Sequence, residues 1–256
     1  MGDPGFEQAV RAAGGVTELA RRIGISQPSV SNWSRIPAER VLAVEAATGV
    51  ARAVLRPDLY GERLGTSDGI TVARAREYAL LAALLMRAPD AALLQRLSRL
   101  EGGGSPLGAA HEALAAAAAS ADADAVSREY FDLFIGVGRG ELLPYASFYL
   151  TGFLHERPLA RLRADLESMG IERASGQCEP EDHAAIQCEI MAGLIDGAFA
   201  APEEQQRRFF ERHLAPWAAR FFADLEGARA ARFYRPVGTI GRLFIDIETQ
   251  AFALPA

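Results

Sequence analysis

Apolar residues recur at intervals of three and four along most of this 256-residue chain, and this spacing constrains the fold more than any other feature. The period matches one face of an α-helix, and the strict alternation typical of half-buried strands is absent. In residues 73–87, for example, Tyr78, Leu81 and Leu85 fall along one helical face. The sequence therefore predicts an all-α protein. Further helices are expected at about 90–100, 109–119, 124–136, 146–154, 158–169, 180–200, 203–225 and 237–253.

Glycine and small polar residues divide the chain in two. Residues 61–70, GERLGTSDGI, have a composition typical of a linker. The part before them has the pattern of four or five short helices, and the part after them has longer amphipathic helices. We therefore predict a small domain over residues 1–62, a linker over 63–70 and a helical-bundle domain over 71–256.

Charge is distributed unevenly along the chain, whose formal net charge is −6. The first sixty residues hold seven arginines against six acidic residues, and the remainder holds twenty against twenty-seven. An acidic surface suits basic partners such as basic peptides, although it also serves solubility. The N-terminus lacks the apolar segment of a secretory signal, and the longest apolar stretch, 78–86, is far short of the roughly 20 residues of a membrane span. We expect a cytoplasmic protein without membrane insertion.

Residues 16–35, VTELARRIGISQPSVSNWSR, have the pattern of a helix-turn-helix unit. Ala20 supplies the small residue where two helices cross, and Gly24 supplies a turn position that tolerates a positive φ. Ser26 is a natural N-cap for the second helix, and Pro28 is tolerated in its first turn. The apolar residues expected between the two helices are Leu19, Ile23, Ile25, Val30 and Trp33.

The stretch that follows ends in an Arg-Pro-Asp-x-Tyr segment at 56–60. With it, residues 6–60 resemble the Cro-like family that includes the YdaS proteins. The resemblance implies that a helix over 26–34 enters the major groove of duplex DNA, which a homodimer would read as two half-sites. The residues expected to contact bases or phosphates are Gln27, Ser29, Ser31, Asn32 and Arg35, with Arg21 and Arg22 on the preceding helix. A fold kept for protein contact is the alternative, because the local charge balance is nearly neutral.

Residues 177–190, QCEPEDHAAIQCEI, carry the clearest pattern of the second part. Pro180 suits the first position of a helix, and acidic residues suit the positive end of its dipole. We therefore expect a helix to begin at Pro180, with Glu179 beside the N-cap and with Asp182 and His183 on the first turn. Alone, the pattern also fits an ordinary acidic helix start. The buried stripe of this helix is expected to hold Ile186, Ile190 and Leu194.

This Glu-Pro-x-Asp-His motif lies some thirty residues after a Tyr-x-Ser-x-Tyr-Leu motif at Tyr145, Ser147, Tyr149 and Leu150. The combination resembles the TorD family of all-helical maturation chaperones for molybdenum-containing redox enzymes. The likeness covers about residues 71–254 and includes the segments REYALLAALLMRAPD and HLAPWAARFF. Val137 departs from the pattern, since a proline often stands at its place.

The resemblance implies a chaperone rather than an enzyme, with no cofactor of its own. Its partner would be the leader peptide and apo form of a precursor such as a molybdenum-dependent formate dehydrogenase. Such a leader is usually a twin-arginine export leader, basic at one end and apolar after it. An acidic rim beside Tyr149, Leu150 and Phe153 would complement both parts, provided that the carboxylates outweigh the helix dipole. The motif-matched leader-binding residues are Tyr145, Ser147, Tyr149, Glu179, Pro180, Asp182 and His183.

Three patterns point weakly to other chemistry. Cys178, His183 and Cys188 have C-x4-H-x4-C spacing, but a fourth zinc ligand is missing and the helix turns Cys188 away from His183. The glycine-rich residues 136–140 lack the ending of a phosphate loop, so a loop between helices is the better interpretation, with nucleotide binding as the alternative. Asp182 and His183 are adjacent, point about 100° apart and have no nucleophile at a suitable spacing. We therefore expect no metal and no catalysis.

Two hypotheses about function remain. The chain is a precursor-binding chaperone with a DNA-binding appendage, or it is a transcriptional regulator that uses a TorD-like domain as its sensor of precursor enzyme. Peptide binding through residues 145–183 fits both. A molybdenum-dependent oxidoreductase encoded beside this chain would favour the first hypothesis.

Overall fold

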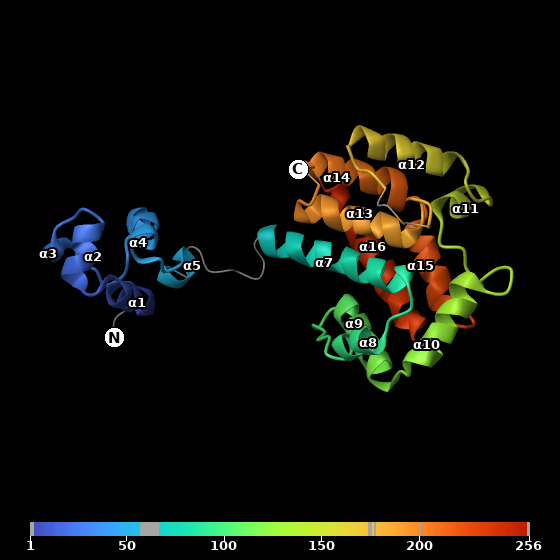
Figure 1. Ribbon diagram of the computed structural model, residues 1–256, viewed down its shortest axis with the longest axis horizontal. Helices are drawn as coiled ribbons and strands as arrows, with labels where there is room; N and C mark the ends of the chain where they lie inside the picture. Colours follow the sequence, from blue (N-terminus) through green and yellow to red (C-terminus); the bar gives the residue numbers. More distant parts are fainter. Residues whose placement is uncertain (1–2, 57–66, 174–175, 177, 200, 255–256) are drawn as a thin grey trace. The chain divides into compact units, whose positions relative to one another are not determined.

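The computed structural model describes residues 3–56, 67–173, 176, 178–199 and 201–254. Within these ranges the chain is helical, and the only β-structure is one isolated bridge, so the all-α prediction is confirmed. The chain divides into two compact units, Met1–Ile70 and Thr71–Ala256 (Figure 1). Each unit has its own apolar core.

The first unit consists of short helices around a small core. They are α1 (Pro4–Ala13), α2 (Val16–Arg22), α3 (Gln27–Ser31), the 3₁₀ turn η1 (Ala38–Arg40), α4 (Val41–Thr48) and α5 (Arg52–Leu55). Leu19 and Val30 are fully buried, and Ile23, Ile25 and Trp33 pack against them partly buried. The predicted core of the helix-turn-helix pattern is therefore confirmed.

The turn between α2 and α3 follows the sequence pattern, but the helix after it is shorter than expected. Gly24 has a φ of +71°, and Ser26 is the N-cap residue of α3. The prediction of a helix over 26–34 is wrong, because α3 ends at Ser31. The chain turns there so that the Trp33 ring can pack edge-on against the Phe6 ring, with centroids 6.2 Å apart, and so that Ile36 is buried.

The second unit is a bundle of longer helices. They are α7 (Ser67–Met86), α8 (Ala91–Leu97), α9 (Pro106–Ser120), α10 (Ala123–Tyr130), the π-helical turn η2 (Phe131–Ile135), α11 (Ala146–Thr151), α12 (Arg157–Ser168), α13 (Ala184–Asp196), α14 (Glu203–Phe209), the π-helical turn η3 (Phe210–Leu214), α15 (Ala218–Gly227) and α16 (Tyr234–Ala253).

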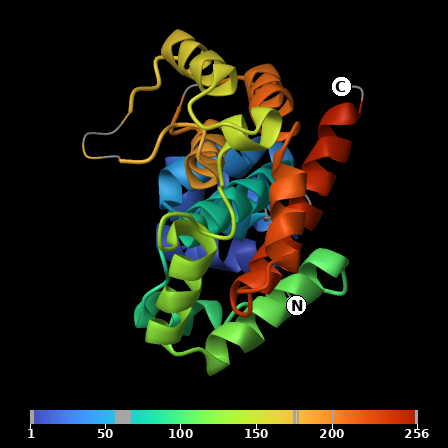
Figure 2. The same ribbon diagram turned by 90° about the vertical axis from the view of Figure 1, so that its right-hand side faces the viewer.

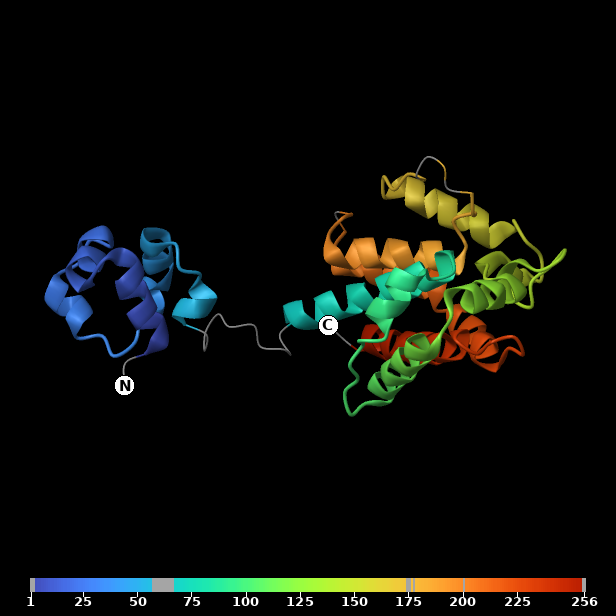
Figure 3. The ribbon, with the colours of Figure 1, turned by 60° about the horizontal axis from the view of Figure 1, so that its bottom comes forward.

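Helix α16 packs against α15 and α9, and Figure 2 shows it along one side of the unit. Gly241 permits the close approach, since a Cβ atom there would lie 2.1 Å from the Phe222 ring. On another side α16 packs antiparallel to α7: Arg74 donates to the buried carboxylate of Glu248 at 2.7 Å, and the Tyr234 hydroxyl donates to the Leu84 carbonyl. Figures 1 and 3 show α12 at the edge of the unit, with α13 between α12 and α7.

Several predicted boundaries differ from the structure, among them the following three. Helix α7 begins at Ser67, so residues 67–70 of the expected linker are helical, and residues 63–66 lie outside the described ranges. The helix expected over 203–225 is interrupted at 215–217, because Pro216 has no N–H for a helical hydrogen bond. The helix expected over 180–200 spans only Ala184–Asp196, for a reason that lies in the site itself.

Candidate peptide-binding site

The two motifs of the second unit meet at the isolated antiparallel bridge between Tyr145 and His183. The Ala146 N–H donates to the Asp182 carbonyl at 2.9 Å, and the Ala184 N–H donates to the Pro144 carbonyl at 2.8 Å. The Tyr145 and His183 rings pack edge to face, with centroids 5.1 Å apart. The structure therefore brings together segments that are almost forty residues apart in the sequence.

Asp182 serves the fold at this bridge. Its side chain is 1 % exposed, and its Oδ2 accepts the Ser147 N–H at 2.9 Å in the first turn of α11. The carboxyl group thus satisfies one of the N–H groups that a helix start leaves without a helical partner. The prediction that Asp182 lies on the first turn of its own helix is wrong, because α13 begins at Ala184. The bridge engages the backbone of Asp182 and Ala184, so α13 cannot begin at Pro180.

His183 is the N-cap residue of α13. Its Nδ1 accepts the Ala185 N–H at 3.1 Å, which places the ring proton on Nε2. Burial lowers the pKa of His183 to about 4, against the opposing effect of the Glu179 and Asp182 carboxyls. The imidazole is therefore neutral near pH 7, and it holds the helix start rather than presenting a charge.

The remaining members of the motif lie nearer the surface but have partners. The Tyr145 hydroxyl donates to Glu179 Oε2 at 2.6 Å, and burial together with this carboxylate raises the pKa of Tyr145. Pro180 is half-buried, and its carbonyl accepts the His183 N–H. Glu181 pairs with Arg163 of α12 at 2.8 Å, a contact that the sequence pattern did not indicate.

Tyr149 lies apart from this cluster and joins the third segment singled out in the sequence. Its hydroxyl donates to Asp224 Oδ2 at 3.0 Å, and its ring packs against Trp217 and Phe221 with centroids 5.6 and 5.8 Å away. The Arg220 guanidinium lies 5.9 Å from the centre of the ring. Tyr149 is thus one wall of an aromatic cluster between α11 and α15.

Exposed apolar side chains follow Tyr149 directly. Leu150, Phe153 and Leu154 are all exposed, Phe153 by 69 %. Helix α11 ends at Thr151, Gly152 after it has the left-handed conformation, and the Thr151 hydroxyl accepts the Phe153 N–H at 3.2 Å. This turn is therefore built to present an apolar ring to solvent.

The glycine-rich residues 136–140 form a loop between helices, as expected. The Arg139 guanidinium stands 5.1 Å from the centre of the Phe148 ring, so the loop lies against α11. Glu141 directly follows the loop and anchors it, because its carboxylate accepts the N–H groups of Arg229 and Ala230. Val137 on the loop and Ile135 just before it are also exposed apolar side chains.

The predicted DNA-contacting residues are all exposed on the first unit, and several have side-chain partners. Gln27 donates to the Ser31 hydroxyl at 2.8 Å, and Arg35 pairs with Asp3 at 3.0 Å. Glu18 pairs with both Arg21 and Arg22, which lower its pKa to about 2. Two of the arginines expected to meet phosphates are therefore already held by an acidic neighbour.

The two cysteines lie in different surroundings. Cys178 is exposed, and Cys188 is buried in α13, where burial raises its pKa to about 12. Within the described ranges, no three His, Cys, Asp or Glu side chains are grouped so that they can hold a metal ion. No helix in the same ranges is long and apolar enough to cross a membrane.

Each unit is matched by a family model. The family model for the nitrate reductase delta subunit matches residues 101–223, and the model for the bacterial toxin YdaS matches residues 6–64. Both resemblances drawn from the motifs, to TorD-type chaperones and to YdaS proteins, are confirmed by matches of this kind.

Individual relatives agree with this. The chain is 27 % identical over 202 residues to the chaperone protein TorD of Shewanella loihica, a match that covers 70 % of this chain and 92 % of the relative. It is 31 % identical to TorD of Aliivibrio fischeri over 50 % of this chain, where the match spans 64 % of the relative, less than two thirds of its length. A solved structure described as a candidate redox enzyme maturation protein from Archaeoglobus fulgidus matches 68 % of this chain and 93 % of that one, at 19 % identity and a TM-score of 0.47.

Proposed function

We propose that this chain is a cytoplasmic maturation chaperone that binds the leader and apo form of a molybdenum-dependent oxidoreductase precursor, for example a formate dehydrogenase. The observation that carries the proposal is the bridge between Tyr145 and His183, which assembles both motifs beside the exposed side chains of Leu150, Phe153 and Leu154. The similarity of the chain to the chaperone protein TorD supports the same proposal.

The surface suits a peptide that is apolar along part of its length. Exposed apolar side chains that lie together on a folded domain mark interaction sites, because burying them against a partner removes them from water. Of the seven motif residues, Tyr145, Tyr149, Glu179 and Pro180 are half-buried and reach the surface. We assign leader contacts to these four. Ser147, Asp182 and His183 are buried and position the surface from below.

The two side chains at the bridge also favour binding over catalysis. His183 is neutral, and its Nδ1 is engaged with the helix start. Tyr145 donates its proton to Glu179, and its raised pKa makes it a weak acid. Neither side chain is poised for proton transfer near pH 7.

The test is isothermal titration of the full chain with the leader peptide of a molybdoenzyme precursor encoded beside it. Phe153→Ser should weaken binding by about tenfold, because burial of one phenyl ring contributes roughly 1.5–3 kcal/mol. Ile247→Ser, which alters a comparably exposed apolar residue on α16, is the matched control and should leave the affinity unchanged. The proposal fails if the wild type binds no leader, or if the two variants behave alike.

The first unit favours a second activity, the binding of duplex DNA. Gln27, Ser29 and Asn32 are exposed on or beside a second helix that the confirmed core holds in place, as major-groove recognition requires. Selection from a random oligonucleotide pool at low salt should yield a preferred site. Gln27→Ala with Asn32→Ala should relax that preference. Glu18→Gln should strengthen binding to all sequences, since it frees Arg21 and Arg22 for phosphates.

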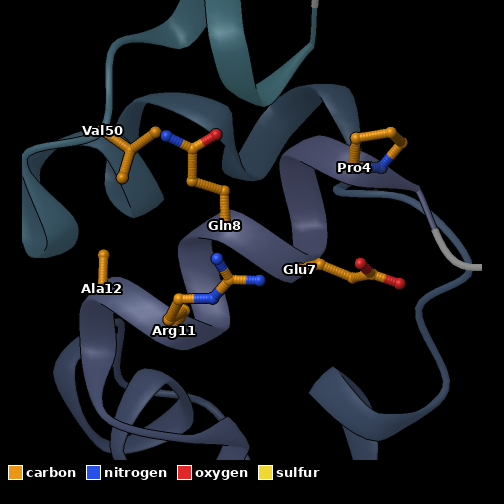
Figure 4. Close-up of a pocket in the computed structure, with 6 residues that line it drawn as sticks. All are labelled: Pro4, Glu7, Gln8, Arg11, Ala12 and Val50. Atoms are coloured by element: carbon orange, nitrogen blue, oxygen red, sulfur yellow. The ribbon is translucent and has the colours of Figure 1, made fainter.

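A homodimer would let two such units read two half-sites. A hollow of about 540 Å³ on the first unit is lined by α1 and Val50, and Glu7 and Arg11 stand one turn apart at its rim (Figure 4). Opposite charges at this spacing suit a twofold contact, in which Glu7 of one protomer pairs with Arg11 of its partner and the reverse. Glu7→Arg should therefore produce monomers in sedimentation, and Glu7→Arg with Arg11→Glu should restore dimers.

The chaperone and regulator hypotheses differ in one measurement. A regulator that senses precursor must bind its DNA site with a different affinity when leader is present, because the two sites share a coupling free energy. Equal DNA affinity with and without saturating leader supports the chaperone with an independent DNA-binding unit. A change of fivefold or more supports the regulator.

A further inference from the structure

A hollow of about 180 Å³ lies between α12 and α13, away from the aromatic cluster around Tyr149. Its apolar lining comes from the inner faces of both helices and from the segments that follow them. The residues that form this lining are Leu166, Ile171, Ile186, Ile190 and Phe199. The hollow thus offers an apolar floor that long side chains can cover.

Three carboxylates also line this hollow, against one arginine. Glu181 is paired with Arg163, and the Arg173 guanidinium donates to the Glu179 carbonyl at 3.1 Å. Glu172 and Glu189 are exposed, and neither makes an ion pair or side-chain hydrogen bond with any described residue. Two carboxylates on separate elements are therefore available to a cation at the mouth of an apolar hollow.

One wall of the hollow is fixed by a glycine. Helix α13 ends at Asp196, and Gly197 after it has the left-handed conformation. The Phe199 N–H then donates to the Gly193 carbonyl at 3.0 Å. A Cβ atom at Gly193 would lie 2.5 Å from Cε2 of the Phe199 ring, so only glycine lets the ring pack against the helix here. The aromatic side chain is thereby held beside Ile190 and Glu189.

We infer that this hollow binds an arginine side chain of the precursor leader, an inference that rests on the proposed chaperone function. The stem would cover Leu166 and Ile171, and the guanidinium would meet Glu172 and Glu189 with the Phe199 ring alongside. A planar guanidinium presents five donors in a fixed fork and can stack flat on an aromatic ring, whereas an ammonium group is a compact point charge with three donors. The motif carboxyls are less suited, because Asp182 is buried and Glu179 and Glu181 have partners.

The hollow and the exposed apolar surface lie at opposite ends of α12. Phe153 and Leu154 precede Arg157, where the helix begins, and Leu166 is in its last turn. Twelve helical residues span about 18 Å, a distance that five or six residues of extended peptide cover. A leader that is basic at one end and apolar after it can therefore occupy both places at once.

The experiment is titration of the full chain with the leader peptide and with the same peptide carrying Lys in place of each Arg. Glu172→Gln with Glu189→Gln should weaken binding of the Arg peptide about tenfold. Glu112→Gln with Glu167→Gln removes the same charge from exposed positions that do not line this hollow, and it should change the affinity less than twofold. We call Glu172→Gln with Glu189→Gln the hollow variant. Replacing Arg by Lys in the peptide should weaken binding to the wild type. The same replacement should weaken binding to the hollow variant only slightly, because the peptide change and the protein change remove the same interaction.

The results separate this inference from the function on which it rests. If the wild type binds the leader and the hollow variant binds it within twofold as tightly, the arginines bind elsewhere and the inference is overturned, while the chaperone proposal stands. The inference is also overturned if the losses of binding free energy from the peptide change and from the protein change add up in the combined experiment. If the wild type binds no leader, both fall.

Discussion

The bridged motifs and the hollow between α12 and α13 use the same residue types in opposite ways. Asp182 is 1 % exposed and caps α11, whereas Glu189, seven residues later, is exposed and has no partner among the described residues. Charge that is buried and bonded holds the backbone, and charge that is exposed and unpaired is available to a ligand. The recognisable motif is thus largely the frame of the site, and the residues beside it carry the free charge.

The largest expected effect of the buried motif is on the pH dependence of the free energy of unfolding. The pKa of His183 is about 4 in the folded chain and near the ordinary 6.5 in the unfolded chain, so the unfolded state takes up the proton first as the pH falls. The free energy of unfolding should therefore decrease between about pH 6.5 and pH 4, by up to about 3 kcal/mol from this group.

Urea denaturation of wild type and His183→Asn across this range measures the effect. Asparagine keeps an N-cap acceptor for α13 but does not titrate, so the difference between the two curves isolates His183 from His213, whose pKa burial also lowers. Parallel curves would show that His183 is not buried in a neutral form.

Asp182→Ala should give the next largest effect. It removes the acceptor of the Ser147 N–H at the start of α11, and a hydrogen bond of this kind to a carboxyl contributes roughly 1.5–3 kcal/mol. The offset is the loss of a buried Oδ1 that has no partner within the described ranges. We expect the melting temperature to fall by roughly 4–8 °C, as about 2 kcal/mol does in a domain of this size.

Asp182→Asn is the control, since its side-chain oxygen can still accept from Ser147. It should lose less than half as much stability as Asp182→Ala. If Asp182→Ala melts at the same temperature as the wild type, the Asp182 carboxyl does not stabilise the fold and is, like that of Glu189, free to bind a ligand.

These two residues also show what local sequence could and could not predict. Helical period, the Gly24 turn and the stripe of Ile186, Ile190 and Leu194 follow from neighbours within a few positions, and the structure confirms them. The start of α13 does not follow. Pro180 is a local signal for a helix start, but a backbone pairing with Pro144 and Ala146, almost forty residues away, prevents it.

The hollow between α12 and α13 could not be predicted from local sequence either, because it is formed by residues that are far apart in the chain. Leu166 and Phe199 are thirty-three residues apart in the sequence, and only the packing of α12 on α13 brings them together. Arg163 could have been suspected as a partner for an acidic motif, because it lies on the amphipathic helix between the two motifs. Nothing in the sequence distinguishes Glu172 and Glu189 from other exposed acids.

Gly193→Ala is expected to separate binding from stability. The added methyl group would force the Phe199 ring to move, while alanine favours the helix by up to about 1 kcal/mol over glycine. The two effects oppose each other, so the melting temperature should change little. Leader affinity should fall severalfold if the ring forms a wall of the binding hollow. Ala192→Gly, a change on the same helix that should lower the free energy of unfolding by about 1 kcal/mol, should not alter affinity. Unchanged affinity in Gly193→Ala would remove Phe199 from the proposed contacts.

The smallest expected effect is on the stability of the hollow variant itself. Glu172 and Glu189 make no ion pair or side-chain hydrogen bond with a described residue, and they line one hollow with Glu181, so their charges repel. Glu172→Gln with Glu189→Gln should therefore leave the free energy of unfolding within about 0.5 kcal/mol of wild type, with any change toward greater stability. Thermal melts at low and high salt measure this, because salt should screen the repulsion and bring the two proteins together. A loss of more than about 1 kcal/mol would mean that these carboxylates hold the fold as Asp182 does, and the distinction between a structural and a free carboxylate would not hold at this site.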